Sequence, residues 1–353
     1  MSILIIGDPH YKQSNSRHTD IMERDILEII KNNEIAFIVI LGDTLDTHER
    51  IYVDCFMRVS KFLDKLIKTE KHVFLLIGNH DRPNNRVFLT DEHPFNLYKH
   101  VKGITVVDTC VVHELNSNIY CNNSELSATS DYNEDKESTK KLRFCFVPYV
   151  PDGMYMKALE VCGIDPQNIS VFFSHSEFDG CKINKLTKKK CDKWPLNFPM
   201  NISGHIHNEE LVQNNLFYTG TPFQHDFNDD PDKGVYLMDL KSGKFELDKV
   251  RLNVPSKIVM KVHFTQLETI QLDPRFDIRL EIIGPIEQVK TLMNRHDMLA
   301  KFAHVSKKYK DETKQSKNMP VITNNFQFYE KMLRGLENNE KLLNAFRGLF
   351  PNI

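Results

Sequence analysis

Long hydrophobic runs, paired cysteines and a large net charge are all missing from this sequence of 353 residues. No stretch approaches the roughly 18 consecutive apolar residues that a membrane-spanning helix requires, so we expect no membrane association. The first residues lack a basic region and their apolar run is short, which predicts no signal peptide. The seven cysteines form no CxxC pair. They therefore indicate reduced thiols, as in cytoplasm or nucleus, and argue against a cysteine-bound zinc site.

The net charge of −2 excludes a protein that coats nucleic acid by bulk positive charge. This charge is unevenly distributed, because residues from Arg251 onward include 17 basic and 11 acidic side chains. The first 250 residues hold 29 basic and 37 acidic side chains. An acidic first part suits a site that binds metal cations, and a basic second part suits contact with DNA. The many Asn, Lys and Ile residues hint at an AT-rich genome, such as that of a virus or phage.

The first hundred residues predict an alternation of strands and helices. Short apolar runs at 3–6, 36–41 and 73–77 are typical of buried strands, and amphipathic segments at 20–32 and 53–67 are typical of helices. This order predicts a βαβαβ unit with parallel strands. In such sheets, functional sites form in the loops at the carboxyl ends of the strands.

The region that follows is richer in strands, and we expect two sheets packed face to face. Its predicted strands are 105–107, 142–147, 171–174, 200–203, 217–219, 234–240 and 245–250. The polar segment 122–141 predicts a mobile hairpin loop.

After about Pro255 the pattern changes to that of a small α/β module. We expect strands at 257–264, 276–283 and 300–306, and a helix at 286–298. A polar linker at 307–318 precedes two short amphipathic helices at 326–336 and 340–350. The sequence thus predicts a catalytic domain at 1–252, a capping domain at 253–310 and a linker with helices at 311–353.

Polar residues that can bind metals follow five of the predicted strands. Their motifs are Asp8-Pro9-His10, Gly42-Asp43-Thr44-Leu45-Asp46, Gly78-Asn79-His80-Asp81, Ser174-His175-Ser176 and Gly204-His205-Ile206-His207. Asp-x-His and His-x-His place both side chains on one side of an extended chain. One such motif alone is most often a surface or structural feature. All five together, with mixed oxygen and imidazole donors, predict a centre of two metal ions.

A pair of metal ions roughly 4 Å apart activates water and holds the oxygens of a phosphoester. The leaving oxygen also needs a proton or nearby positive charge, which suits His80. The alternative role of His80 is a supporting hydrogen bond to the ligands. His48 and His225 match no motif, so we expect surface or core positions for them.

The five motifs resemble those of calcineurin-like metallophosphoesterases. Within that superfamily the chain resembles most the SbcD nucleases, the family of the eukaryotic meiotic-recombination nuclease and phage recombination nucleases. Further similarity lies in three segments, Val147-Pro148-Tyr149-Val150, Tyr218-Thr219-Gly220-Thr221-Pro222 and Lys233-Gly234-Val235-Tyr236. The similarity covers about residues 1–250 at the level of motifs. The segment 122–141 is longer than the turn expected there.

The resemblance implies an α/β fold of four layers, in which two facing β-sheets are flanked by helices, with a small capping domain and C-terminal helices. It also implies two divalent metal ions, foremost Mn²⁺, with Mg²⁺, Fe²⁺ or Zn²⁺ as alternatives. One metal would take Asp8, His10 and His207. The other would take Asn79, His175 and His205, with Asp43 bridging the two and His80 acting in catalysis. Asp46 and Asp81 would lie beside the site, Asp46 with a structural hydrogen bond as one alternative and Asp81 to orient His80 or its loop.

The same resemblance implies a nuclease in DNA repair, recombination or replication. It would act as a 3′-to-5′ exonuclease on double strands and an endonuclease on single strands, as a homodimer with an SMC-like ATPase called SbcC in bacteria. DNA contacts are expected at Lys185, Lys188, Lys189 and Lys190, unless this lysine-rich segment is simply a solvated loop. The ATPase would bind Leu333, Leu336, Leu343 and Phe346, which could instead pack within their own domain.

Two other functions stay open. A phosphodiesterase or phosphatase for a nucleotide or other small molecule would use the same metals. A protein phosphatase is disfavoured, because those enzymes carry Arg-Gly-Asn-His-Glu where this chain has Ile77 before Gly78 and Asp81 after His80. A non-catalytic scaffold at DNA ends is disfavoured by the complete ligand set.

Overall fold

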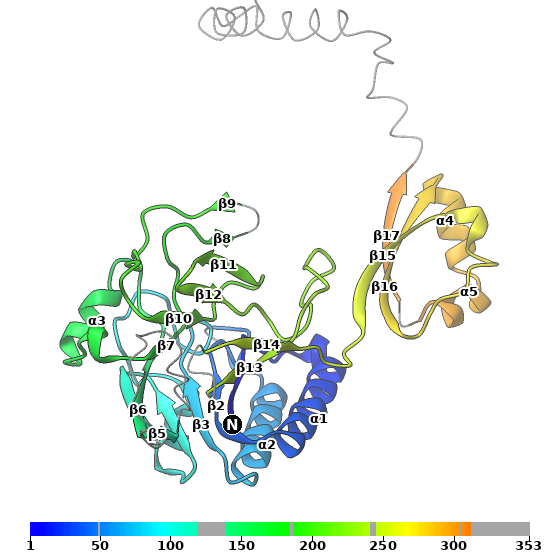
Figure 1. Cartoon of the computed structure of the whole chain (residues 1–353). Coiled ribbons are helices and arrows are strands. Elements are labelled where there is room, and N and C mark those ends of the chain that lie inside the picture. Colours follow the sequence, from blue (N-terminus) through cyan, green and yellow to red (C-terminus); the bar gives the residue numbers. More distant parts are fainter. Residues whose placement is uncertain (49, 119–138, 184–185, 241–244, 304, 312–353) are drawn as a thin grey trace, which may run out of the picture. The chain divides into compact units, whose positions relative to one another are not determined.

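The computed structural model describes residues 1–48, 50–118, 139–183, 186–240, 245–303 and 305–311 (Figure 1). The chain divides into two compact units, Met1–Lys257 and a second that begins at Ile258. The sequence had placed the boundary after residue 252. Within the described ranges, no helix is both long enough and apolar enough to cross a membrane.

The first sheet of the larger unit confirms the βαβαβ prediction. Its strands are, in spatial order, β14 (Leu247–Val250), β13 (Val235–Asp239), β1 (Ser2–Ile6), β2 (Ile35–Ile40), β3 (His72–Leu76) and β4 (Ile104–Val107). Strands β1 to β4 run parallel, and β13 pairs with β1 in the antiparallel sense. The helices α1 (Ser16–Asn32) and α2 (Val53–Ile67) form the two crossovers.

Successive side chains of β1 point to opposite faces of this sheet, and the side chains on both faces are buried. Leu4 and Ile6 belong to the cluster that includes Met22 of α1 and Phe62 of α2. Ile3 and Ile5 point to the other face and belong to a second buried cluster. A strand that is apolar on both faces is therefore covered by helices on one side and by a sheet on the other.

The second sheet provides that cover. Its strands are, in spatial order, β11 (Glu210–Gln213), β12 (Leu216–Tyr218), β10 (Met200–Ser203), β7 (Val171–Ser174), β6 (Thr139–Val147) and β5 (Val111–Asn118). Phe146 of β6 stacks on Phe74 of β3 with ring centroids 4.0 Å apart. The opposite face packs on α3 (Tyr155–Val161) and on Trp194. The expected layers of helices, sheet, sheet and helix are confirmed.

The elements of this unit that escaped the sequence analysis include β5, β11 and α3. Each is short or only half-buried, so its apolar periodicity is weak. Residues 139–141 of the expected loop 122–141 belong to β6, and the rest lies outside the described residues. The described residues also form 3-10 helices at Gln13–Asn15, Pro94–His100, Pro166–Asn168 and, in the second unit, Phe264–Gln266.

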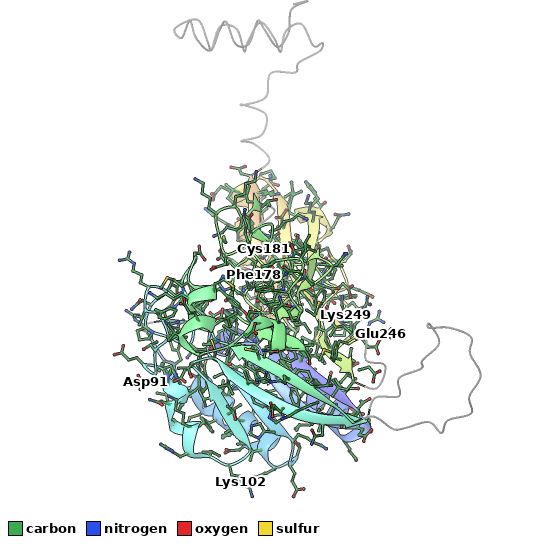
Figure 2. The ribbon with its side chains drawn as sticks, turned by 60° about the vertical axis from the view of Figure 1, so that its left-hand side comes forward. Asp91, Lys102, Phe178, Cys181, Glu246 and Lys249 are labelled. Carbon is green, nitrogen blue, oxygen red and sulfur yellow. The ribbon has the colours of Figure 1, made fainter. Side chains whose placement is uncertain are left out.

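A small hairpin of β8 (Lys182–Ile183) and β9 (Leu186–Thr187) emerges near the second sheet. The backbone N–H of Cys181 donates to the carbonyl of Phe178 over 3.1 Å, and both side chains are buried (Figure 2). Residues 184–185 at its tip lie outside the described part of the chain.

The second unit contains a sheet in the order β15 (Ser256–His263), β16 (Phe276–Gly284) and β17 (Ser306–Asp311), with α4 (Ile286–Met293) and α5 (His296–Lys301). Three predictions were wrong here. The helix expected at 286–298 is interrupted where Arg295 is extended and pairs with Asp297. The strand expected at 300–306 starts only at Ser306, because Phe302 is buried at the end of α5. Residues 307–311 of the expected linker pair with β16 in parallel.

Candidate metal centre

Five strands of the two sheets deliver polar residues to one edge. Asp8, Asp43 and Asn79 follow β1, β2 and β3, and His175 and His205 follow β7 and β10. The strands within each set run parallel, so their carboxyl ends lie together. The structure thus brings residues of all five motifs together at this edge.

The backbone of the site is tightly packed. A Cβ atom on Gly78 would lie 2.2 Å from Oδ1 of Asp43, so only glycine allows these two loops to approach so closely. His10, Asp43 and His205 have positive φ angles of 44°, 45° and 76°. Non-glycine residues in this conformation are strained and are often found at functional sites.

The first group of potential ligands consists of Asp8, His10 and His207, whose donor atoms lie within 4.8 Å of one another. Nε2 of His10 is 3.1 Å from Nε2 of His207. Oδ2 of Asp8 accepts the backbone N–H of His205 over 2.7 Å. Among the described residues, the buried Oδ1 of Asp8 accepts no hydrogen bond. Buried carboxylate oxygens are rarely left unpaired, so this atom fits a metal ligand.

The second group consists of Asp43, His175 and His205, again with donor atoms within 4.8 Å. Oδ1 of Asn79 joins them, 3.0 Å from Nε2 of His175 and 2.8 Å from Nδ1 of His205. The carbonyl of Leu41 lies 2.8 Å from Nδ1 of His175 and so fixes the proton on that nitrogen. Nε2 is left to face the group.

Asp43 lies between the two groups. Its Oδ1 is 3.3 Å from Nε2 of His175, and its Oδ2 is 3.7 Å from Nε2 of His10. The two oxygens of one carboxylate therefore face ligands of different groups. This is the geometry that a bridging carboxylate requires.

The charges of the site favour a cation. Burial, together with the neighbouring Asp43, raises the pKa of Asp8 well above its ordinary value. Burial would also raise the pKa of Asp43, but His175, His10 and His80 hold it well below the ordinary value. A divalent cation would stabilise both carboxylates in their charged form. Carboxylate, amide and imidazole donors fit Mn²⁺, Fe²⁺ or Zn²⁺.

His80 is positioned by three contacts. Its backbone N–H donates to Oδ1 of Asp43 over 2.8 Å, and its Nδ1 lies 2.8 Å from the carbonyl of Asp46. Its ring stacks on His48 with centroids 4.3 Å apart. Because Nδ1 is engaged with a carbonyl, Nε2 is the nitrogen that faces the site, 4.0 Å from Oδ2 of Asp43. The side chain is 30% exposed, so a substrate can reach it.

The two acidic residues expected beside the site have different tasks. Asp46 contacts Nδ1 of His10 over 3.4 Å and Nζ of Lys12 over 3.2 Å. Asp81 orients loops and not the ring of His80. It accepts backbone N–H groups from Gly78, Thr44 and Leu45, over 3.0, 3.2 and 2.9 Å. Burial and Asp43 raise the pKa of Asp81 to about 7.

Sequence reasoning missed three residues of the site. His48 was expected at the surface or in the core, but it supports His80 and reaches the carbonyl of Asn79 over 2.8 Å. His225 is buried, yet it packs edge-on against His10 and approaches the carbonyl of Asp8. Neither belongs to a motif, so no local signal revealed them. Glu177 lies 2.8 Å from Nε2 of His205, and its position two residues after His175 was the available signal.

The predicted DNA-binding lysines differ in their surroundings. Lys188 pairs with Glu177 over 2.7 Å, whereas Lys189 and Lys190 are exposed. The hydrogen bond from His205, together with Lys188, lowers the pKa of Glu177 to about 2. Lys185 lies outside the described residues, as do Leu333, Leu336, Leu343 and Phe346.

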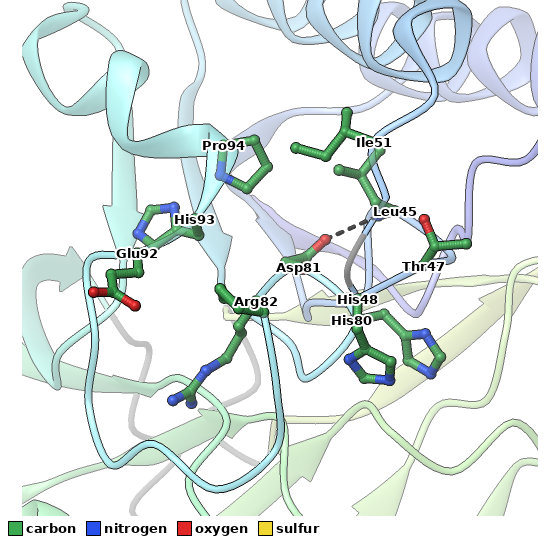
Figure 3. Close-up of a pocket in the computed structure, with 11 residues that line it drawn as sticks. Leu45, Thr47, His48, Ile51, His80, Asp81, Arg82, Glu92, His93 and Pro94 are labelled. Atoms are coloured by element: carbon green, nitrogen blue, oxygen red, sulfur yellow. Dashed lines mark hydrogen bonds between the residues drawn. The ribbon is translucent and has the colours of Figure 1, made fainter.

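A cavity of about 260 Å³ adjoins the site beside His80 (Figure 3). Its walls are mainly apolar and include Leu45, Ile51, Pro83 and Pro94. The stacked rings of His48 and His80 line it as well. Figure 3 also shows the hydrogen bond that the backbone N–H of Leu45 donates to Asp81. A flat apolar group of a substrate would fit this cavity while its phosphate lies near His80.

The fold and the geometry of the site are those of one class of protein. Comparison with known sequences identifies this class. Residues 1–209 match the family of calcineurin-like phosphoesterases, and the chain belongs to that family. It is a phosphoesterase whose family uses divalent metal ions.

Two viral proteins are similar to this chain. "Putative phosphoesterase 078R" of Invertebrate iridescent virus 3 is 34% identical over 257 residues, which cover 72% of this chain and 67% of the relative. "Putative phosphoesterase 244L" of Invertebrate iridescent virus 6 is 33% identical over 297 residues, which cover 82% of this chain and 95% of the relative.

Proposed function

We propose that this protein is a DNA nuclease that hydrolyses phosphodiester bonds with two divalent metal ions. The observation that carries the proposal is the position of Asp43, whose two carboxylate oxygens face two separate groups of ligands. His80 lies beside this carboxylate with Nε2 directed to the site. Activity on double strands would be 3′-to-5′ exonucleolytic, and activity on single strands would be endonucleolytic.

In this proposal, Asp8, His10 and His207 hold one metal ion, and Asn79, His175 and His205 hold the other, with Asp43 shared. The bound cations would supply Lewis-acid activation of water and of the phosphoryl oxygens. Mn²⁺ is the metal we expect, with Mg²⁺, Fe²⁺ and Zn²⁺ as alternatives to be compared in the same assay.

The protein's own contribution to bond cleavage centres on His80. The carbonyl of Asp46 accepts the proton on Nδ1, so Nε2 carries a proton only when the ring is protonated. Burial lowers the pKa of His80, which makes the protonated ring a stronger acid. From Nε2 the proton can pass to the leaving oxygen, or its charge can stabilise the phosphate in the transition state. His48 limits rotation of the ring by stacking on it.

Ile77 and Asp81 depart from the protein-phosphatase pattern, which disfavours a protein phosphatase and leaves a nucleotide phosphodiesterase open. Two observations favour DNA as the substrate. Lys189 and Lys190 extend an exposed basic segment next to Glu177 and His205, where phosphates could be contacted. The motifs of residues 1–250 resemble those of the SbcD nucleases.

A nucleotide phosphodiesterase is the second candidate. The cavity beside His80, about 260 Å³ in volume, has room for one nucleoside and would suit a small substrate as well. A scaffold without activity at DNA ends is disfavoured, because the candidate ligand groups of the described residues would suit a catalytic metal centre.

One assay distinguishes these functions. The purified protein is incubated with Mn²⁺ and either end-labelled duplex DNA or bis(p-nitrophenyl) phosphate. A nuclease shortens the labelled strand from its 3′ end, and low salt strengthens this activity because phosphate contacts are screened by salt. Hydrolysis of the small ester with DNA left intact at low salt would refute the nuclease and favour the phosphodiesterase.

The proposal extends to organisation and partners. Residues 253–310 would form a cap that faces DNA, and the segment 311–353 would dock on an SMC-like ATPase of the SbcC type. The nuclease would act as a homodimer in DNA repair, recombination or replication. The net positive charge beyond residue 250 supports the contact with DNA.

A further inference from the structure

The two ring nitrogens of His205 have different partners. Nδ1 faces the second ligand group, 2.8 Å from Oδ1 of Asn79 and 3.2 Å from Nε2 of His175. Nε2 points the opposite way and lies 2.8 Å from Oε1 of Glu177. An ionised carboxylate only accepts hydrogen bonds, so the proton of a neutral His205 lies on Nε2. The lone pair of Nδ1 is then directed at the ligand group.

Glu177 is itself held in place. Its second oxygen, Oε2, pairs with Nζ of Lys188 over 2.7 Å and lies 3.9 Å from Sγ of Cys191. The side chain is only 13% exposed, as is typical of a carboxylate that is fixed by partners on both oxygens. A chain of contacts therefore runs from the lysine-rich segment through Glu177 to His205.

The contacts between Lys188, Glu177 and His205 have a physical consequence if His205 is a metal ligand. A carboxylate that accepts the second N–H of a ligating histidine fixes its tautomer and ring orientation and raises its basicity. Removal of such a partner typically weakens metal binding or activity by roughly 10- to 100-fold. We propose that Glu177, held by Lys188, is a positioning residue that sets His205 to bind the second metal ion through Nδ1. This inference rests on the proposed metal centre.

The direct test is the affinity for Mn²⁺, measured by isothermal titration calorimetry on the full chain after metal removal. The wild type should bind two ions, and Glu177→Ala should bind one of them roughly 10- to 100-fold more weakly. Glu210→Ala is the matched control. Glu210 is 15% exposed and pairs with Lys182 over 3.1 Å, but no contact with a histidine is recorded for it in the described structure. It should bind both ions like the wild type.

A second variant separates positioning from folding. Glu177→Gln keeps an oxygen that can accept the N–H of His205, so it should recover most of the lost affinity. Nitrogen chemical shifts of His205 should show the proton on Nε2 in the wild type and in Glu177→Gln, and a mixture of tautomers in Glu177→Ala. Equal thermal unfolding of the metal-free proteins confirms that the variants are folded.

The role of Lys188 is tested by a double-mutant cycle. If Lys188 acts through Glu177, Lys188→Met should weaken Mn²⁺ binding by a few fold. The variant that carries both Glu177→Ala and Lys188→Met should then bind no worse than Glu177→Ala alone. Additive losses would show that Lys188 acts independently and would overturn that part of the proposal.

The outcomes distinguish this inference from the proposed function. Wild-type affinity for both ions in Glu177→Ala would overturn the positioning role, whatever the enzyme hydrolyses. Failure of the wild type to bind two ions would instead refute the metal centre itself. Absence of DNA cleavage by a protein that binds two ions would refute the nuclease and leave the role of Glu177 intact.

Discussion

The backbone N–H of His80 donates a 2.8 Å hydrogen bond to Oδ1 of Asp43. This hydrogen bond therefore links Asp43, which is proposed to bridge two metal ions, directly to His80, which is proposed to act on the leaving group. Gly78 makes this possible, because any side chain there would collide with Asp43. Displacement of either residue should affect both metal binding and proton transfer, so each role must be tested with its own readout.

Replacement of His80 by glutamine should abolish most of the activity. Loss of a positioned proton donor lowers kcat by roughly 10²- to 10⁴-fold. The expected result is this loss of DNA cleavage with Mn²⁺ binding by calorimetry left largely unchanged, since the proposed ligands are intact. If the variant failed to bind Mn²⁺, His80 would be structural and not catalytic.

The bridging position of Asp43 predicts a difference in metal stoichiometry. Asp43→Ala should weaken the binding of both ions, because each group loses a ligand. His207→Ala should weaken only one, because His207 belongs to the first group alone. Calorimetric titration with Mn²⁺ measures both sites. Weakening of a single site in Asp43→Ala would show that this carboxylate does not bridge.

Asp81 should matter more for stability than for chemistry. Its removal leaves the backbone N–H groups of Gly78, Thr44 and Leu45 buried without their acceptor. Asp81→Ala should therefore lower the free energy of unfolding by about 2 kcal/mol or more, measured by urea denaturation. The exposed Asp91 (Figure 2) offers a control, since Asp91→Ala should change stability little. A result equal to this control would contradict the structural role of Asp81.

Asp108 gives a prediction for pH. Burial would raise its pKa, but hydrogen bonds from His93 and Lys99 outweigh burial and lower the pKa below its ordinary value of 3.8. A carboxyl group whose pKa is lower in the folded than in the unfolded state stabilises the protein at pH values above its ordinary pKa. This stabilisation disappears as the pH falls through the lowered pKa. Asp108→Asn should therefore be about 1–3 kcal/mol less stable at pH 7 and approach the wild type below pH 4.

The measurement for Asp108 is urea denaturation between pH 3 and pH 8. Asp248→Asn, which alters an exposed carboxylate on β14, should follow the wild-type curve throughout. A stability difference for Asp108→Asn that stays constant over this range would show that the charge of Asp108 is not responsible.

Docking of the ATPase is tested in the segment 311–353. Leu333→Glu and Phe346→Glu place a charge in the apolar stripes that the sequence predicts, and a buried unpaired charge is costly. Both variants should lose the SMC-like ATPase in pull-down experiments while they retain nuclease activity on their own. Glu337→Gln, which alters a polar residue between the two predicted helices, is the control. Unchanged capture by both apolar variants would refute the docking site.

The order of motifs and elements along the chain could be read from the sequence. Continuous apolar runs and helical apolar spacing are local properties, so they predicted β1, β2, β3, α1 and α2 to within a few residues. The same reasoning failed in the second unit, where the helix expected at 286–298 is divided into α4 and α5 at the extended Arg295. Arg295 contacts Glu268, which lies far away along the chain, and the sequence pattern gives no sign of that contact.

For the site, the sequence by itself determined which residues follow strand ends and carry metal-binding donors. Only the tertiary structure decided how they are oriented and by which neighbours. His225 lies far along the chain from His10 yet packs against its ring, and Glu177 became a partner of His205 because β7 and β10 are adjacent. Donor chemistry is a property of each side chain. Its direction is set by contacts between distant segments, which exist only once the sheets have paired and packed.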